Sequence, residues 1–334
     1  GFPIKAAQDM AHCFDVSEQD TIFWFTDMGW MMGPWLFEGA LLLGATALCY
    51  EGSPDYPQPD RVWQLVEQYG VTVLGIAPTA IRALMPLGTA WVTRHDLSSL
   101  RVLGGTGEPW NPEPWRWYFE HVGGGRCPII NYSGGTEISG GIVGCHTIHP
   151  LKVCSFAGPV PGIAADVIDE AGNSVRGSVG ELAIRKPWPG ILRGIWGDRE
   201  RFVATYFGKW DGVYFPGDGA KRDGDGYFWL LGRVDDVMNV AGHRIGTMEV
   251  ESALVDNPKV AEAAVVGVAH ELKGTAIAAF VTLKAGHAGS DSVVADLKDH
   301  VVKKIGAIAR PEKILFTADL PKTRSGKIMR RLLR

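Results

Sequence analysis

Short apolar runs alternate with an amphipathic helical pattern in the first part of the chain. The runs at 44–50 and 71–77 are bounded by turn residues, and residues 60–69 between them place Val62 and Val66 on one helical face. Alternation of this kind predicts a parallel sheet covered by helices. The chain has 334 residues, which is enough for a large core and two or more domains.

The segment 28–50 is apolar enough to suggest a membrane span. It contains Glu38, follows Asp27, and is interrupted by several glycines and by Pro34. A spanning helix needs about 20 predominantly apolar residues with few charges. We therefore expect a buried helix followed by a strand.

The pattern changes in about the second half of the chain. Residues 156–231 consist of short strand patterns with Gly and Asp turns, which predicts a β-rich subdomain. The residues after 233 predict a small α+β unit. Its expected helices are 248–255 and 291–305, and its expected strands are 263–268, 276–283 and 314–317.

Composition limits the possible partners. The net charge is −4, which disfavours general nucleic-acid binding, although residues 235–334 carry 15 basic and 12 acidic side chains. The five cysteines form no CxxC pair, which favours reduced thiols and a cytoplasmic location. Cys145, His146, His149 and Cys154 lie close in sequence, but their spacing fits no zinc pattern.

The C-terminal segment is strongly basic. Six basic residues stand in the last thirteen positions, and Lys327 follows a Ser-Gly pair. An ammonium group beside a flexible glycine suits a phosphate or a carboxylate. A solvated basic tail, or one that touches nucleic acid, is the alternative. The segment is not a Walker loop, because Pro321 stands where that loop needs glycine and Ile328 where it needs Ser or Thr.

Together with three upstream blocks, this tail resembles the end of an AMP-forming acyl-CoA synthetase of the acetyl-CoA synthetase type. The blocks are 104–109 (GGTGEP), 131–137 (NYSGGTE) and 214–218 (YFPGD), the last leading to 232–249. The resemblance implies a multi-subdomain α/β fold with a β-rich subdomain in residues 1–234, and a small α+β lid domain in 235–334. It also places a hinge at Asp235 and the family's N-terminal phosphate-binding loop before residue 1.

The resemblance implies ATP-dependent activation of a carboxylic acid to an acyl-adenylate, followed by transfer to CoA. The cofactors would be ATP, Mg²⁺ and CoA. Lys327, Arg244 and Thr136 would be catalytic, and acetylation of Lys327 would regulate the enzyme. Glu137 would bind the magnesium ion, since that cation prefers carboxylate oxygen. The nucleotide would contact Gly107, Glu108, Pro109, Asn131, Tyr132, Ser133, Gly134, Gly135, Thr136, Asp218, Arg233 and Arg244.

The CoA side of the resemblance is weaker. The family serine near the pantetheine is Ala241 here, followed by Gly242, and Lys303 stands beside the position of a phosphate-binding arginine. A solvated helix face explains Lys303 equally well.

The acyl pocket departs from that of acetate-specific relatives. Those relatives have Trp two residues before the family threonine, and this chain has Gly134 there. The other pocket positions correspond to Met31, Met32 and Thr106. Removal of an indole would make room for several methylenes, each worth about 0.8 kcal/mol when buried. We therefore expect an acid larger than acetate, such as propionate or butyrate, with a keto acid as in acetoacetyl-CoA synthetases as an alternative.

Other functions remain open at this point. An adenylating enzyme with a different acceptor, such as a peptide-synthetase adenylation domain, is one. An inactive fragment that binds AMP is another. Measuring ATP turnover as well as AMP binding distinguishes an active enzyme from such a fragment. A dehydrogenase is disfavoured, because no GxGxxG lies between a strand and a helix.

Overall fold

A computed structural model describes residues 1–234, 237–240, 243–270, 274–322 and 328–333. Contacts between Cα atoms divide the chain into two compact units. Unit 1 consists of Gly1–Pro216 and Arg222–Trp229, and unit 2 of Gly217–Lys221 and Leu230–Arg334. The domain boundary between residues 234 and 235 stays a prediction.

A seven-stranded sheet is the centre of unit 1, with the order β2-β1-β3-β4-β5-β6-β7. The first five strands in this order are parallel, as the sequence predicted, and β6 and β7 are antiparallel additions. The strands are β1 (Thr21–Phe25), β2 (Thr46–Leu48), β3 (Val73–Ile76), β4 (Val102–Gly105), β5 (Ile129–Gly135), β6 (Gly140–Gly144) and β7 (Gly158–Pro159).

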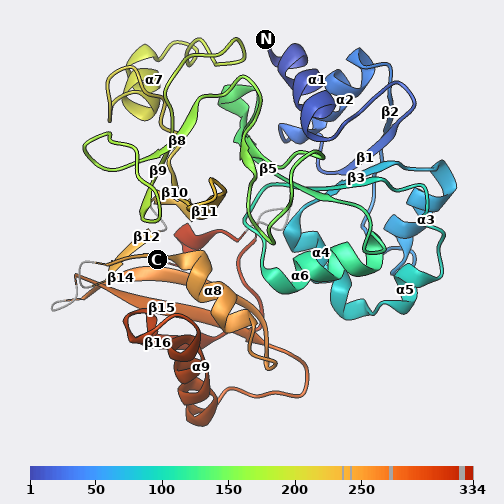
Figure 1. Cartoon of the computed structure of the whole chain (residues 1–334). Helices are drawn as coiled ribbons and strands as arrows, with labels where there is room; N and C mark the ends of the chain where they lie inside the picture. Colours follow the sequence, from blue (N-terminus) through green and yellow to red (C-terminus); the bar gives the residue numbers. More distant parts are fainter. Residues whose placement is uncertain (235–236, 241–242, 271–273, 323–327, 334) are drawn as a thin grey trace. The chain divides into compact units, whose positions relative to one another are not determined.

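Helices cover both faces of this sheet (Figure 1). Successive strand residues point to opposite faces, so Phe23 packs with one set of helices and Trp24 with the other. Trp115 belongs to the same core as Phe23, whereas Trp24 contacts Phe14 and Trp35. The first set is α3 (Arg61–Tyr69), α4 (Pro78–Leu84), α5 (Ala90–Thr93) and α6 (Pro112–Trp117), and the second is α1 (Phe2–Cys13) and α2 (Met32–Leu42).

The local predictions for this unit are confirmed. The apolar segment 28–50 forms α2 and β2, and the amphipathic segment 60–69 forms α3. Gly70 ends α3 in the left-handed conformation, with φ of 57°, which glycine adopts without strain. Among the described residues, no helix combines the length and the hydrophobicity that a membrane crossing requires.

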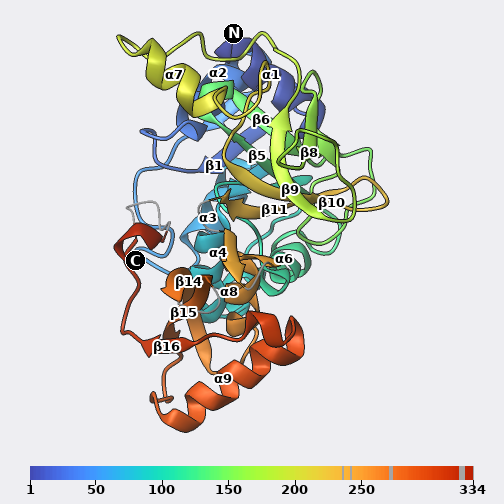
Figure 2. The ribbon, with the colours of Figure 1, turned by 90° about the vertical axis from the view of Figure 1, so that its left-hand side faces the viewer.

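Short strands dominate residues 156–233, as expected. A four-stranded sheet has the order β11-β10-β9-β8, and its strands β8 and β9 pair antiparallel (Figure 2). Helix α7 (Arg199–Tyr206) was not predicted, because it buries none of its residues and so has no apolar stripe. The Asp198 side chain caps it by accepting a hydrogen bond from the Arg201 N–H. The strands are β8 (Ala165–Ile168), β9 (Val179–Ile184), β10 (Asp218–Arg222) and β11 (Phe228–Arg233).

Unit 2 contains a five-stranded sheet with the order β13-β12-β15-β14, in which β16 pairs with β15. Its core includes Leu254, Ile277, Leu297 and Val301 from the two helices and the sheet. The predicted helices and strands of this unit are confirmed, with β14 and β15 longer than expected. They are β12 (Val237–Val240), β13 (His243–Gly246), α8 (Thr247–Val255), β14 (Val260–His270), β15 (Gly274–Leu283), α9 (Asp291–Lys304) and β16 (Lys313–Phe316).

Candidate active site

The predicted nucleotide loops of unit 1 follow the carboxyl ends of two adjacent parallel strands, at one edge of the sheet. Strands β4 and β5 are parallel neighbours, with Gly105 opposite Asn131. The segment from Thr106 to Pro109 follows β4, and the turn η3 (Thr136–Ile138) follows β5. Ligands of open α/β sheets bind outside the carboxyl ends of the strands. The sheet topology therefore brings two of the three upstream blocks to the kind of edge where ligands bind.

The segment from Thr106 to Pro109, called the Gly107 strip below, combines an exposed backbone at Gly107 with a hydrogen-bonded side chain at Glu108. Gly107 is exposed and has φ of 101°, a conformation that glycine adopts without strain. The carboxylate of Glu108 accepts hydrogen bonds from Arg82 Nη2 at 2.7 Å and from the Thr79 hydroxyl. Arg82 Nη1 also donates to Asn111 Oδ1 at 3.1 Å. The Glu108 side chain thus fastens the strip to α4, and the strip's exposed backbone is the part that can lie along a ligand.

Asn131 and Tyr132 have buried side chains that bond to the protein. The Asn131 amide donates to the carbonyl of Ser155 at 3.1 Å. The Tyr132 hydroxyl donates to Asp9 Oδ2 at 2.5 Å. Burial, followed by the neighbouring Asp9, raises the pKa of Tyr132 well above its ordinary value, so the phenol stays protonated. Nucleotide contacts by these two residues stay predictions, and they would involve the backbone.

Gly134 lies where the pairing of β5 with β6 shifts register. A Cβ atom built on Gly134 would stand 1.8 Å from the carbonyl oxygen of Gly140 and 2.7 Å from the Cα of Gly141. A side chain at this position would collide with backbone, so a Trp does not fit without movement of β6. The expectation that the missing indole leaves extra room therefore loses its geometrical basis. Contacts among Met31, Met32, Thr106 and Gly134 in a pocket stay a prediction, with Met32 buried and Met31 half-buried.

The η3 turn carries Thr136 and Glu137. Thr136 is exposed, and Glu137 is half-buried. The Tyr206 hydroxyl donates to Glu137 Oε1 at 3.1 Å, and the Leu192 N–H donates to the Glu137 carbonyl at 2.7 Å. Sequence reasoning missed Tyr206 and the 188–192 segment, because neither belongs to a motif.

The predicted ribose and phosphate contacts of unit 2 form an ion pair. Asp218 begins β10 and Arg233 ends β11, and Arg233 Nη1 lies 3.5 Å from Asp218 Oδ1. A Cβ at Gly217 would stand 2.3 Å from Arg233 Nη2, so glycine at 217 leaves space for the guanidinium. The pair brings a carboxylate that can accept ribose hydroxyls beside a guanidinium that can bind phosphate.

Several predicted residues of unit 2 lie outside the described residues. These are Asp235, Ala241, Gly242 and Lys327. Arg244 is placed by its backbone in β13, opposite Asn239 in β12. Lys303 lies exposed in the last turn of α9. The roles proposed for all of them stay predictions.

Ion pairs fix the chain on both sides of the segment that contains Lys327. Lys322 Nζ lies 2.7 Å from Glu262 Oε2 on β14. Arg330 donates from Nε and Nη2 to the two carboxylate oxygens of Glu251 on α8, at 2.9 and 2.7 Å. Glu251 also accepts a hydrogen bond from the Val265 N–H at 2.7 Å. A bidentate arginine–carboxylate pair fixes orientation as well as position.

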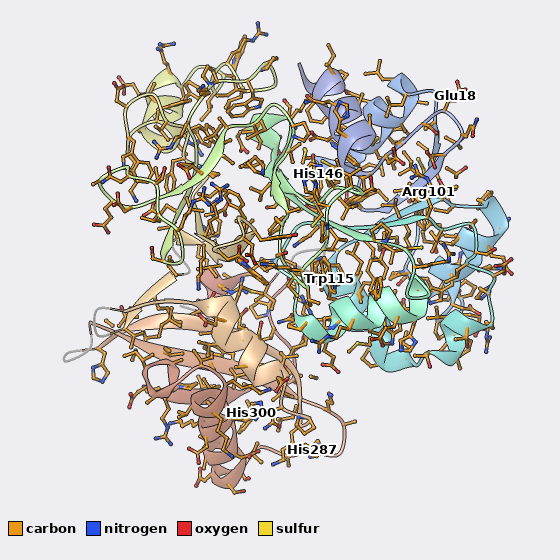
Figure 3. The ribbon with its side chains drawn as sticks, in the orientation of Figure 1. Glu18, Arg101, Trp115, His146, His287 and His300 are labelled. Carbon is orange, nitrogen blue, oxygen red and sulfur yellow. The ribbon has the colours of Figure 1, made fainter. Side chains whose placement is uncertain are left out.

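The Cys and His residues considered as a metal site do not form one in the described part of the chain, where no group of three or more potential ligands occurs. His146, labelled in Figure 3, is buried, and burial lowers its pKa. Burial raises the pKa of the Cys145 thiol to about 11.

The family model of the AMP-binding enzymes matches residues 4–196. The chain belongs to the AMP-binding enzyme family. The model of the AMP-binding enzyme C-terminal domain matches residues 249–327, in the order that the family resemblance predicted.

Curated relatives carry the name acetyl-coenzyme A synthetase. The protein of Gemmatimonas aurantiaca is 57% identical over the whole of this chain, which covers 52% of that relative. The protein of Rubrobacter xylanophilus is 55% identical over 96% of this chain, and 50% of that relative is covered. The chain thus spans about half the length of the curated relatives it matches.

Solved structures of the family are similar in fold. Acetoacetyl-CoA synthetase from Streptomyces lividans matches the whole chain with a TM-score of 0.90 and 27% identity, and 52% of that structure is covered. The anthranilate CoA ligase AuaEII, in complex with anthranoyl-AMP, matches the whole chain with a TM-score of 0.86 and 28% identity, and 62% of it is covered.

Proposed function

We propose that this chain supplies the nucleotide-binding strand edge and the C-terminal domain of an AMP-forming acid–thiol ligase. The observation that carries the proposal is the sheet edge where the Gly107 strip and the η3 turn emerge from adjacent parallel strands, in a chain of the AMP-binding enzyme family. The high identity to proteins named acetyl-CoA synthetase supports the same activity.

The reaction has two steps. The substrate carboxylate attacks the α-phosphorus of ATP, the bond to the bridging oxygen breaks, and pyrophosphate leaves, giving an acyl-adenylate. The thiol of CoA then attacks the acyl carbon, the proton of the thiol is lost, and AMP leaves. Negative charge gathers on phosphoryl oxygens during the first step, so positioning and cationic stabilisation supply most of the catalysis.

The residues at the sheet edge suit these tasks. The exposed backbone at Gly107 can approach the base, and the exposed Thr136 hydroxyl can donate to a phosphate oxygen. In unit 2, Asp218 would accept ribose hydroxyls, and Arg233, Arg244 and Lys327 would supply positive charge. Lys303, Ala241 and Gly242 would serve the CoA side.

Glu137 is suited to a magnesium ion. Mg²⁺ bound with a nucleotide uses one or two carboxylates together with substrate phosphates and water. Glu137 offers one carboxylate, of which Oε1 accepts from Tyr206. The ion would neutralise charge on the phosphates when bound, and Glu137 would hold it.

The acid is proposed to be a short-chain carboxylate. The expected preference for an acid larger than acetate rested on extra room in the acyl pocket at Gly134. Because the Gly140 carbonyl lies so close to that position, Gly134 no longer supports this preference. The names of the curated relatives favour acetate, whereas the acetoacetyl-CoA synthetase likeness favours a keto acid. Acetate is therefore the first substrate to test, against propionate, butyrate and acetoacetate.

The test is pyrophosphate release by the protein expressed from its complete gene, with acetate, propionate, butyrate, hexanoate and acetoacetate in turn. Lys327→Ala is the control, and its release should fall at least about 100-fold if the ammonium stabilises the transition state. Release that depends on one acid and collapses in the control supports the ligase. Tight AMP binding without release for any acid would contradict it in favour of an inactive AMP-binding protein. Adenylation without acyl-CoA formation would indicate another acceptor.

A further inference from the structure

The η3 turn is held from outside the nucleotide motif by the segment 188–192. Trp188 Nε1 donates to the Ile138 carbonyl at 3.0 Å. The Leu192 N–H donates to the Glu137 carbonyl at 2.7 Å, and the Ser139 hydroxyl donates to the Gly190 carbonyl at 2.5 Å. Three successive residues, Glu137 and Ile138 of the turn and Ser139 that follows it, are thereby bonded to one short segment. The backbone that carries the Glu137 carboxylate has little freedom to shift.

The Glu137 side chain is held separately, by α7. The Tyr206 hydroxyl donates to Oε1 at 3.1 Å. In the described part of the chain, the second oxygen, Oε2, accepts no hydrogen bond. A neutral donor on one oxygen restrains the carboxylate and leaves both the negative charge and one oxygen available to a cation.

Tyr206 is itself fixed by a row of rings. Its ring stacks on that of Tyr214, with centroids 5.3 Å apart and planes at 6°. The Tyr214 ring meets Trp188 edge to face, with centroids 5.6 Å apart. We call Trp188, Tyr214 and Tyr206 the aromatic row. Both of its ends donate a hydrogen bond to the η3 turn, Trp188 to the backbone of Ile138 and Tyr206 to the side chain of Glu137.

We propose that Tyr206 is a positioning residue, which orients Glu137 for a divalent cation carried by the nucleotide. The inference rests on the proposed function, in which Glu137 is the magnesium ligand. Mg²⁺ demands near-ideal octahedral geometry, so the direction of a ligand carboxylate matters as well as its distance. Removal of the partner that orients a ligand typically costs 10- to 100-fold in metal affinity or activity.

The test measures how much Mg²⁺ strengthens ATP binding, without turnover. Calorimetry gives the ATP dissociation constant with Mg²⁺ and with EDTA, for the protein expressed from its complete gene. In Tyr206→Phe, which keeps the ring and the stack, the Mg²⁺-dependent gain in affinity should shrink about tenfold. ATP affinity in EDTA should stay within twofold of the parent protein.

Two further variants make the result specific. Tyr227→Phe also removes one phenolic hydroxyl, which donates to the Pro150 carbonyl at 2.7 Å away from η3, and it should keep the full gain. Glu137→Gln should lose the gain, because the ligand charge is gone. Thermal unfolding of each variant shows whether the fold is intact.

The outcomes separate the inference from the function on which it rests. A full gain in Tyr206→Phe with a lost gain in Glu137→Gln would overturn the role of Tyr206 and leave Glu137 as the ligand. A full gain in both variants would overturn the role of Glu137 and the inference with it. An equal loss of ATP affinity with and without Mg²⁺ in Tyr206→Phe would mean a general structural role, which also overturns the inference.

Discussion

The two faces of the seven-stranded sheet are built differently. The face under α3–α6 is filled by apolar and aromatic side chains such as Phe23 and Leu74. The face under α1 and α2 also buries charge. Lys5 pairs there with Asp9, and the second oxygen of Asp9 accepts from the Tyr132 hydroxyl at 2.5 Å and from the Gly141 N–H at 2.9 Å.

The two faces of the sheet are expected to contribute differently, one to the stability of the fold and the other to the position of the η3 turn. Apolar burial stabilises a fold without prescribing one arrangement, whereas a buried ion pair contributes little net stability and tolerates few arrangements. Asp9 bonds to both β5 and β6, at the two sides of the η3 turn. We therefore expect the polar face to fix the position of the turn, and the apolar face to supply most of the stability.

The largest expected effect is that of Asp9→Ala. The change leaves the Lys5 ammonium buried without its partner, which should lower the free energy of unfolding by about 4 kcal/mol. Denaturation in urea measures the loss, and Asp9→Asn, which keeps the shape and an acceptor, should lose less. A loss below about 1 kcal/mol in Asp9→Ala would mean that the polar face is not held by this pair.

Leu74→Ala should cost about 3 kcal/mol, because the residue is fully buried in the apolar core and its removal leaves a cavity. Unlike the loss in Asp9→Ala, this one should not vary with pH. Leu41→Ala on the exposed side of α2 is the matched control and should change stability by less than about 0.5 kcal/mol. If the stability loss in Leu74→Ala depended strongly on pH, the proposed difference between the apolar and the charged face of the sheet would be wrong.

Asp20→Asn tests a carboxylate at the amino end of β1. Burial alone raises the pKa of Asp20, but hydrogen bonds from Arg101 (Figure 3), Thr72 and Ser17 outweigh it and hold the pKa at about 2. Because this folded-state pKa lies below the ordinary value of 3.8, the stabilisation is present above that value and is lost as the pH falls toward 2.

The Asn variant should be about 2 kcal/mol less stable at neutral pH, since it loses charge-assisted hydrogen bonds. Its stability should also fall less steeply between pH 4 and pH 2, the range set by these two pKa values. Unfolding curves across this range check both expectations. Parallel curves for the two proteins would show that Asp20 titrates equally in the folded and unfolded states.

The smallest expected effect is that of Ser139→Ala. The variant loses the hydrogen bond to the Gly190 carbonyl, a neutral contact next to the polar face, and should lose about 1 kcal/mol of stability. Thermal unfolding measures it. A loss as large as that of Asp9→Ala would place the rigidity of the turn in its neutral contacts rather than in the buried charges.

The elements of the fold were predictable where periodicity was strong. The helices 60–69, 248–255 and 291–305 and the strands around them follow directly from apolar spacing, because their buried faces repeat with the period of the element. Helix α7 has no buried face, so the sequence contained no pattern to detect.

The candidate site was predictable only where it coincided with motifs. Gly107, Thr136 and Glu137 were proposed from the sequence blocks, and the sheet topology brings the loops that carry them to one edge of the sheet. Tyr206 was not, because it lies 69 residues from Glu137 and the contact depends on the three-dimensional packing of α7. The geometry at Gly134 was not predictable either, since a register shift between strands leaves no mark in composition.

The Gly140 carbonyl beside Gly134 also bears on how such a protein can diversify. Every substitution of Gly134 adds a Cβ atom in the direction of that oxygen, so each single-codon change at this position first meets a folding penalty. Position 134 is therefore closed to gradual mutational exploration unless β6 moves at the same time. A relative with Trp at this position therefore needs β6 in a different place, so the exchange of Gly134 for a larger residue requires a compensating change in β6.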